Sequence, residues 1–104
     1  MEAKKRKQLE ANGWKVGSVD EFLGLAPEEA AYIEIRLALA ARLRARRQEQ
    51  HLTQVEMARR IRSSQSRVAK MEVGDPSVSL DLIVRSLLAL GASPEDLATA
   101  IRAS

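Results

Sequence analysis

Hydrophobic residues recur at helical spacing over most of the chain, beginning with a long segment in its first half. The spacing predicts a helix from Pro27 to about Gln50, because proline suits the first helical position and the two glutamates that follow favour the positive end of the helix dipole. One apolar side comprises Tyr32, Ile35, Leu39 and Leu43, and an adjacent strip comprises Ile33, Leu37, Ala40 and Ala41. This stripe is wider than one packing partner requires. We therefore expect part of it to pack on the segment 18–25 or on a second subunit.

Two short helices about a turn are predicted between Thr53 and Gly74. Thr53 and Glu56 have the spacing of a capping box, and Ser64 is a suitable N-cap for the second helix. Val55, Met57, Ala58 and Ile61 form the expected buried face of the first helix, and Val68 and Met71 form that of the second. We expect Leu52 to enter the core just before the first cap.

The outer side of the second short helix is polar and basic: it carries Gln65, Ser66, Arg67 and Lys70, with no acidic residue until Glu72. Glutamine and serine side chains hydrogen-bond to base edges, whereas arginine and lysine contact guanine or phosphate. Two helices about a tight turn, the second with such a face, are what a helix-turn-helix requires.

The remaining segments complete an all-α chain. Ser79 is expected to cap a helix that ends at Gly91, and Ser93 a last helix with Pro94 in its first position. The apolar residues of these two helices are Leu80, Leu82, Ile83, Leu87, Leu88 and Leu90, followed by Leu97, Ala100 and Ile101; Val78 should point inward. Residues 1–26 are expected to form an N-terminal extension, an arm plus a short helix, and residues 27–104 the helix-turn-helix domain.

Composition excludes several function classes. The 104 residues include no cysteine and one histidine, His51, so a disulfide framework, a thiolate nucleophile and a histidine-rich metal site are excluded. The glycines form no phosphate-binding pattern, and the paired acids at helix starts are explained by capping. We expect no enzyme activity, no metal and no cofactor. We also expect no membrane span and no signal peptide, and hence a cytoplasmic protein.

The net charge of +3 conceals a segregation of charge along the chain. Residues 36–70 hold ten Lys/Arg and two acids, a net +8, whereas residues 16–35 hold five acids and no base, a net −5. A basic block attracts a phosphate backbone, and such binding weakens with salt. A solvated helix face is the alternative for any charge run, but here the block coincides with the two predicted short helices.

The stretch TQVEMARRIRSSQSRVAKMEVG resembles the helix-turn-helix of the Cro/C1-type (XRE) family of repressors, over about Leu39 to Leu97. The matching landmarks are Thr53-Gln54, Ala58, Ser64-Gln65, Glu72 and Gly74. The resemblance implies a five-helix lambda-repressor-like fold that binds a palindromic operator as a homodimer. It implies DNA contacts by Gln54, Ser64, Gln65, Ser66 and Lys70, to which we add Arg67 from its charge, and an ion pair between Arg47 and Glu72. The chain departs from the family at His51 and Arg62, where glycine is usual, so Arg62 must be strained or the turn must differ.

The extension GDPSVSLDLIVRSLLALGAS is similar to the subgroup that contains HigA-type antitoxins. The resemblance implies a repressor that autoregulates its operon and inhibits a RelE-like toxin, whose basic surface would suit the acidic start of the long helix. The candidate partner-binding residues are Trp14, Val16, Phe22, Leu23 and Leu25; the alternative for Trp14 is that it covers the domain's own core. The alternative is a stand-alone transcriptional regulator of the same family without a toxin.

Overall fold

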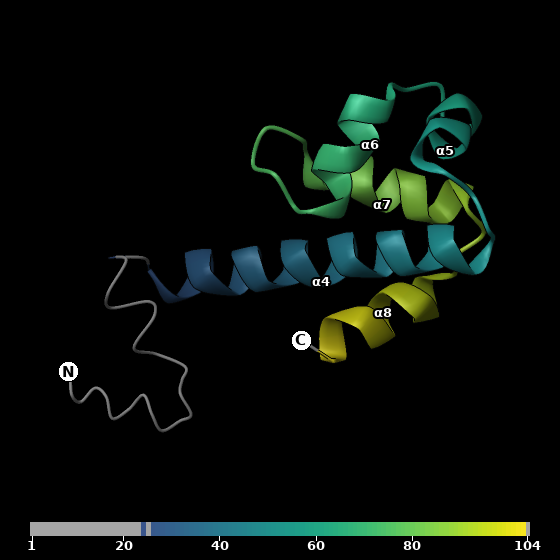
Figure 1. The fold of residues 1–104 in the computed structure, drawn as a ribbon. Helices are drawn as coiled ribbons and strands as arrows, with labels where there is room; N and C mark the ends of the chain where they lie inside the picture. The colour runs from purple at the N-terminus through teal and green to yellow at the C-terminus, as the bar shows by residue number, and fades with distance from the viewer. Residues whose placement is uncertain (1–23, 25, 104) are drawn as a thin grey trace. The chain divides into compact units, whose positions relative to one another are not determined.

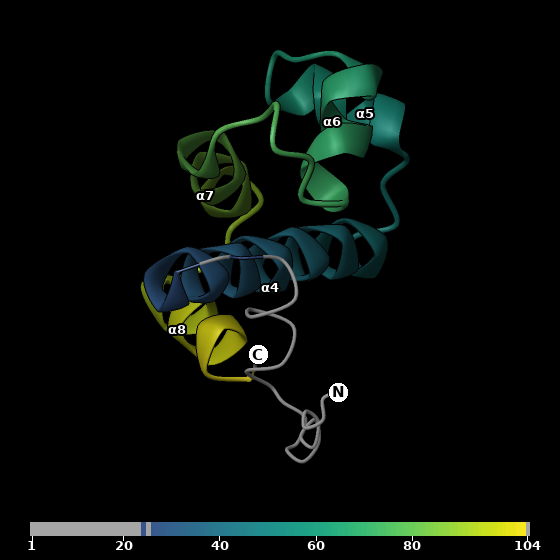
Figure 2. The same cartoon turned by 90° about the vertical axis from the view of Figure 1, so that its left-hand side faces the viewer.

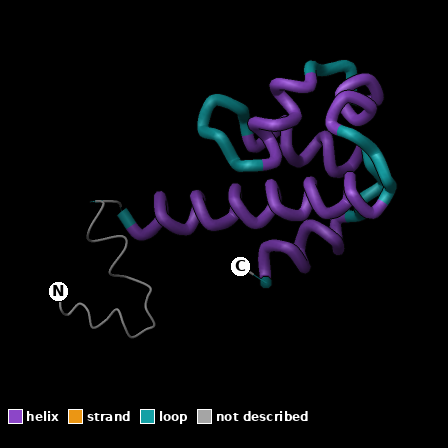
Figure 3. The backbone as a smooth tube through the Cα atoms, in the orientation of Figure 1, coloured by secondary structure: helices purple, strands orange, loops and turns teal. Residues whose placement is uncertain are grey.

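The computed structural model describes residues 24 and 26–103, and all their regular structure is helical (Figures 1 and 3). The helices are α4 (Pro27–Glu49), α5 (Gln54–Arg60), α6 (Gln65–Glu72), α7 (Leu80–Ala89) and α8 (Pro94–Arg102). Over these residues the predicted all-α fold of five helices is confirmed, and the long helix ends one residue before the predicted Gln50. The N-terminal extension falls almost wholly outside the described residues.

The chain divides into two compact units within α4, between Ile33 and Glu34. Within the second unit, α5, α6 and α7 lie on one side of α4, and α8 lies on the other side, in both of two perpendicular views (Figures 1 and 2). The domain boundary expected after residue 26 stays a prediction.

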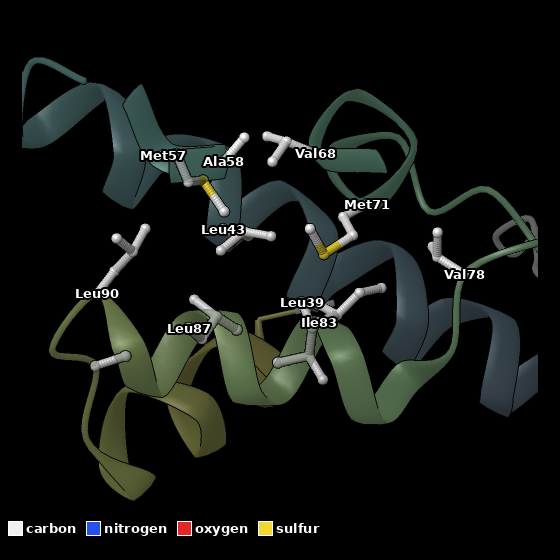
Figure 4. Close-up of a cluster of buried hydrophobic side chains, with 11 residues drawn as sticks. Leu39, Leu43, Met57, Ala58, Val68, Met71, Val78, Ile83, Leu87 and Leu90 are labelled. Carbon is white, nitrogen blue, oxygen red and sulfur yellow. The ribbon is translucent and has the colours of Figure 1, made fainter. Parts of the chain in front are cut away.

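One hydrophobic core joins α4 to the four later helices (Figure 4). Its largest fully buried side chains are Leu43, Met57, Met71, Ile83, Leu87 and Val68, with Leu39, Ala58, Val78 and Leu90 beside them. The predictions that Leu39 and Leu43 of α4 and Val68 and Met71 of α6 are buried are confirmed. Leu52 packs against this core while partly exposed.

The prediction that Val55 belongs to the buried face of α5 is wrong, because 51% of this residue is exposed. Met57 and Ala58 set the buried direction of α5. Val55 precedes Met57 by two positions, which is a rotation of about 200° around a helix, so it points away from the core.

Side-chain caps begin the helices where they were predicted, at Thr53, Ser64, Ser79 and Ser93. Thr53 and Glu56 form a complete capping box, in which the Thr53 N–H donates to Glu56 Oε1 at 2.8 Å. The hydrogen bonds from the backbone N–H of Thr53 and from its hydroxyl lower the pKa of Glu56 below its ordinary value. A lowered pKa in the folded state means that the cap stabilises at neutral pH, and that its contribution is lost as the pH falls through the lowered value.

Helices α4 to α7 end in the same hydrogen-bonding pattern, the Schellman motif, which places one residue in the left-handed region. After α5, for example, Ser63 N donates to Ala58 O at 2.8 Å and Arg62 N donates to Arg59 O at 3.3 Å. Gly74 and Gly91 occupy the left-handed position after α6 and α7, but His51 and Arg62 occupy it after α4 and α5, with φ of 59° and 58°. Of the two outcomes expected at Arg62, a strained residue or a different turn, the structure shows the strained residue, and His51 adopts the same conformation.

Replacing Arg62 by glycine is expected to raise the free energy of unfolding by about 0.5–1 kcal/mol, because the strain relieved exceeds the added freedom of the unfolded chain. Urea denaturation measures the change. Arg59→Gly, within α5, is the matched control and should lower the free energy of unfolding by about 0.5–1 kcal/mol. Equal destabilisation by both variants would show that position 62 carries no strain.

Candidate nucleic-acid interface

Helix α6 presents a polar outer face and a buried inner face. Val68, Met71 and Glu72 are buried, whereas Gln65, Ser66, Arg67 and Lys70 are exposed. The Ser64 hydroxyl accepts from Arg67 N at 3.1 Å and so starts the helix at Gln65. The four residues predicted to form the outer face are therefore all available to a partner.

A relay of hydrogen bonds runs from the outer face of α6 into the protein. Gln65 Nε2 donates to Gln54 Oε1 at 2.8 Å, and Gln54 Nε2 donates to Glu72 Oε1 at 3.1 Å. Arg47 closes the relay with two bonds to the Glu72 carboxylate, at 2.5 Å from Nε and 3.1 Å from Nη2. The predicted ion pair between Arg47 and Glu72 is thus present, and it is attached to the first residue of α6.

The carboxylate at the inner end fixes the orientation of both amides. A carboxylate only accepts hydrogen bonds, so Gln54 must turn its NH₂ toward Glu72 and its oxygen toward Gln65. Gln65 must then turn its own NH₂ toward Gln54. Each amide NH₂ has two hydrogens, so Gln65 keeps one N–H and its Oε1 for a partner.

The ion pair is shielded from water. The side chain of Glu72 is 2% exposed and that of Arg47 is 12% exposed. Arg47 Nη1 also donates to Leu52 O at 2.7 Å, which ties the segment before α5 to the same group. Two charges and two amides therefore hold α4, α5 and α6 in one arrangement.

On the opposite flank of α6 is a hollow of about 260 Å³. It is lined by Ser64, Ser66, Arg67, Lys70, Ser77 and Val78. Ser77 was not among the predicted site residues, because no local sequence pattern marks it as a neighbour of Lys70. The hollow joins four of the predicted DNA-binding residues to a loop that was not predicted to take part.

The exposed cations extend beyond α6. Arg59, Arg60 and Arg62 are exposed on α5 and in the turn after it. Arg60 Nη1 lies 3.4 Å from Gln50 Oε1, and among the residues that the structure describes none of the three arginines forms an ion pair. Positive charge therefore borders α6 on the side of α5 as well.

Comparison with known proteins agrees with this geometry: a family model described as a helix-turn-helix domain matches residues 38–100. The chain belongs to the helix-turn-helix domain family. The match covers α5, the turn and α6, the two short helices that were predicted to form the motif, and it indicates a DNA-binding regulator. No curated protein matches the chain, and no solved structure does.

Two further predictions for this helix-turn-helix protein concern its partner-binding residues and a membrane span. The candidate partner-binding residues Trp14, Val16, Phe22, Leu23 and Leu25 lie outside the described residues. None of the helices among residues 26–103 is both long and apolar enough to cross a membrane.

Proposed function

We propose that this protein is a transcriptional repressor that binds a specific sequence of double-stranded DNA. The observation that carries the proposal is the orientation of Gln65 by the buried Glu72 through Gln54. A side chain whose donor and acceptor are fixed before binding loses little freedom on contacting a base. The exposed cations on α5 and α6 supply the attraction to phosphate that such binding needs.

Gln65 is proposed to contact adenine. Adenine presents an N7 acceptor and an N6 donor in the major groove, and a glutamine amide matches both with one N–H and one oxygen. These are the two groups that the relay leaves to Gln65. Ser66, next on the outer face of α6, is proposed to contact a neighbouring base edge. Ser64 and Gln54 are proposed to lie close to the sugar-phosphate backbone of the DNA.

The protein is proposed to act as a homodimer on a palindromic operator. One α6 helix covers only a few base pairs, and two half-sites about 34 Å apart allow two helices to enter successive major grooves on the same side of the DNA. Analytical ultracentrifugation of the protein, alone and with a duplex that carries both half-sites, measures how many copies bind one duplex. A single copy per operator duplex would contradict the proposal.

The finer proposal is that the protein is the antitoxin of a toxin–antitoxin pair and represses its own operon. Its support is the similarity of residues 74–93 to HigA-type antitoxins and the acidic block at residues 16–35, which suits a basic RelE-like toxin. Co-expression with the neighbouring reading frames, followed by purification, tests it. If no small basic protein co-purifies, the stand-alone regulator is the better description.

Replacing Gln65 by alanine is expected to weaken binding to the operator by about 1–3 kcal/mol and to relax the preference at one base pair. The measurement is a gel-shift titration, over a series of salt concentrations, against the DNA upstream of this protein's own coding sequence. Gln48→Ala removes an exposed glutamine of α4 and is the matched control. If the operator affinity of Gln65→Ala equals that of the control, Gln65 does not contact a base.

A further inference from the structure

One flank of α4 stays exposed between the helices that pack on its two sides. Helices α5, α6 and α7 lie on one side of α4 and α8 lies on the other (Figures 1 and 2). Glu34, Leu37, Ala41 and Arg44 are all exposed, and Leu37 is 49% exposed. Their spacing of three, four and three positions keeps them within about 80° of one another around the helix, as in the contact face of a coiled coil. The apolar stripe of α4 thus extends beyond the core onto this exposed flank.

A recess borders the exposed flank where α8 meets α4. This alanine hollow, of about 330 Å³, is lined by Ala38, Ala41, Arg42, Ala100 and Ala103. Its walls are low because four of the five side chains are single methyl groups. Leu37 projects from α4 one helical turn before Ala41, so the same flank carries a large apolar side chain beside a recess of small ones. A surface with a projection and a matching recess is suited to pair with a copy of itself about a twofold axis.

The two ends of the exposed flank carry opposite charges. Glu34 lies three positions before Leu37, and Arg44 lies three positions after Ala41. Among the residues that the structure describes, neither Glu34 nor Arg44 forms an ion pair. If two α4 helices lie antiparallel with their crossing point at position 39, Leu37 of one copy faces Ala41 of the other, and Glu34 faces Arg44 in the same way. A single register therefore matches both the apolar and the charged residues.

We propose that a second copy of this chain covers the exposed flank, with the two α4 helices antiparallel and Leu37 of each copy seated in the alanine hollow of the other. Ion pairs between Glu34 and Arg44 close both ends of the interface. The twofold axis of such a pair is perpendicular to the plane of the two helices, so α5, α6 and α7 of both copies lie on one side of that plane. Both α6 helices then face the same duplex. The inference rests on the homodimer proposed above and names its contact surface.

Charge reversal tests the register of the two helices. Glu34→Arg and Arg44→Glu each place like charges at both ends of the interface, and each should raise the dissociation constant of the dimer by about tenfold or more. Sedimentation velocity without DNA measures it. The variant that carries both substitutions restores opposite charges and should dissociate like the wild type. Within one chain the two residues are about 15 Å apart along α4, so this rescue cannot arise inside a single copy. Absence of rescue overturns the proposal.

Introduced thiols test the same register directly, because the chain contains no cysteine. Leu37→Cys mixed with Ala41→Cys under oxidising conditions should give a disulfide-linked dimer, since the two positions face each other across the interface. Either variant alone should give much less of it, because the same position in the two copies is offset by about 6 Å along the helices. Linkage in the mixture that is no greater than in the separate variants overturns the antiparallel pairing.

A matched pair of leucine variants tests the location of the interface. Leu37→Arg should be a folded monomer by circular dichroism and sedimentation, whereas Leu88→Arg, at a leucine of α7 that is 45% exposed, should dimerise like the wild type. If only Leu88→Arg dissociates, or if the wild type is itself a monomer, another occupant covers the exposed flank and the proposal is overturned.

None of these measurements uses DNA, so they separate this inference from the proposed function. A cross-linked dimer that binds all sequences equally would refute the specific repressor and leave the interface in place. A sequence-specific dimer without the cross-link would refute the interface alone.

Discussion

Glu72→Ala is expected to lower the free energy of unfolding by about 3–5 kcal/mol, because it leaves the charge of Arg47 buried without its partner. The side chain of Arg47 is only 12% exposed, so water cannot replace the two lost bonds without a rearrangement of α4 and α6. The amide of Gln54 loses its acceptor at the same time. Chemical denaturation followed by circular dichroism measures the change.

Two further variants separate the cost of leaving a buried charge unpaired from the net contribution of the ion pair to the free energy of unfolding. Arg85→Ala breaks an ion pair in which Arg85 and Asp81 are 75% and 71% exposed, and should cost less than about 1 kcal/mol. Arg47→Met combined with Glu72→Met should recover much of the loss, since two apolar side chains need no partner. If Glu72→Ala costs no more than Arg85→Ala, the buried pair contributes nothing beyond a surface pair.

Leu87→Ala is expected to lower the free energy of unfolding by about 2–5 kcal/mol, because Leu87 is fully buried at the centre of the core. The loss combines the transfer of the removed carbons to water with the cavity that remains. Urea denaturation of the purified variant measures it, and the slope against urea concentration should stay unchanged if the folded state keeps its compactness.

The next residue on α7 provides the control. Leu88 is 45% exposed, and the same truncation there should cost less than about 1 kcal/mol. Both variants change the intrinsic helix preference of α7 equally, so the difference between them isolates burial. Similar costs would mean that Leu88 is covered in solution, for example by a second subunit.

The sequence predicts the helices of this fold well because their ends are coded locally. Thr53, Ser64, Ser79 and Ser93 each sit within three residues of the amide that they cap. The buried face of a helix is predicted from the spacing of apolar residues over several turns, and α5 is too short to show that spacing. Seven residues complete fewer than two turns, which is why Val55 was assigned to the wrong side.

The connections within the candidate site depend on how helices cross, and the sequence does not show this. Gln54 and Gln65 are 11 positions apart, and Gln54 and Glu72 are 18 apart, so their contacts arise only once α5 packs on α6. Ser77 approaches Lys70 because Arg36 holds the loop from 42 positions before Val78. The individual residues could be predicted as polar and exposed, but the donor and acceptor roles that they acquire could not.

With the base contact proposed for Gln65, the relay also limits how this protein can change its DNA preference during evolution. Position 65 faces a carbonyl oxygen of Gln54, whose direction is set by a carboxylate in the protein interior. Side chains that carry a donor, such as asparagine, lysine or arginine, keep that contact, whereas glutamate would place two acceptors against each other. We expect selection for new operators to explore adenine and guanine contacts freely at this position. Recognition of cytosine by an acidic side chain there would require Gln54 to change first, so the order of substitutions is constrained.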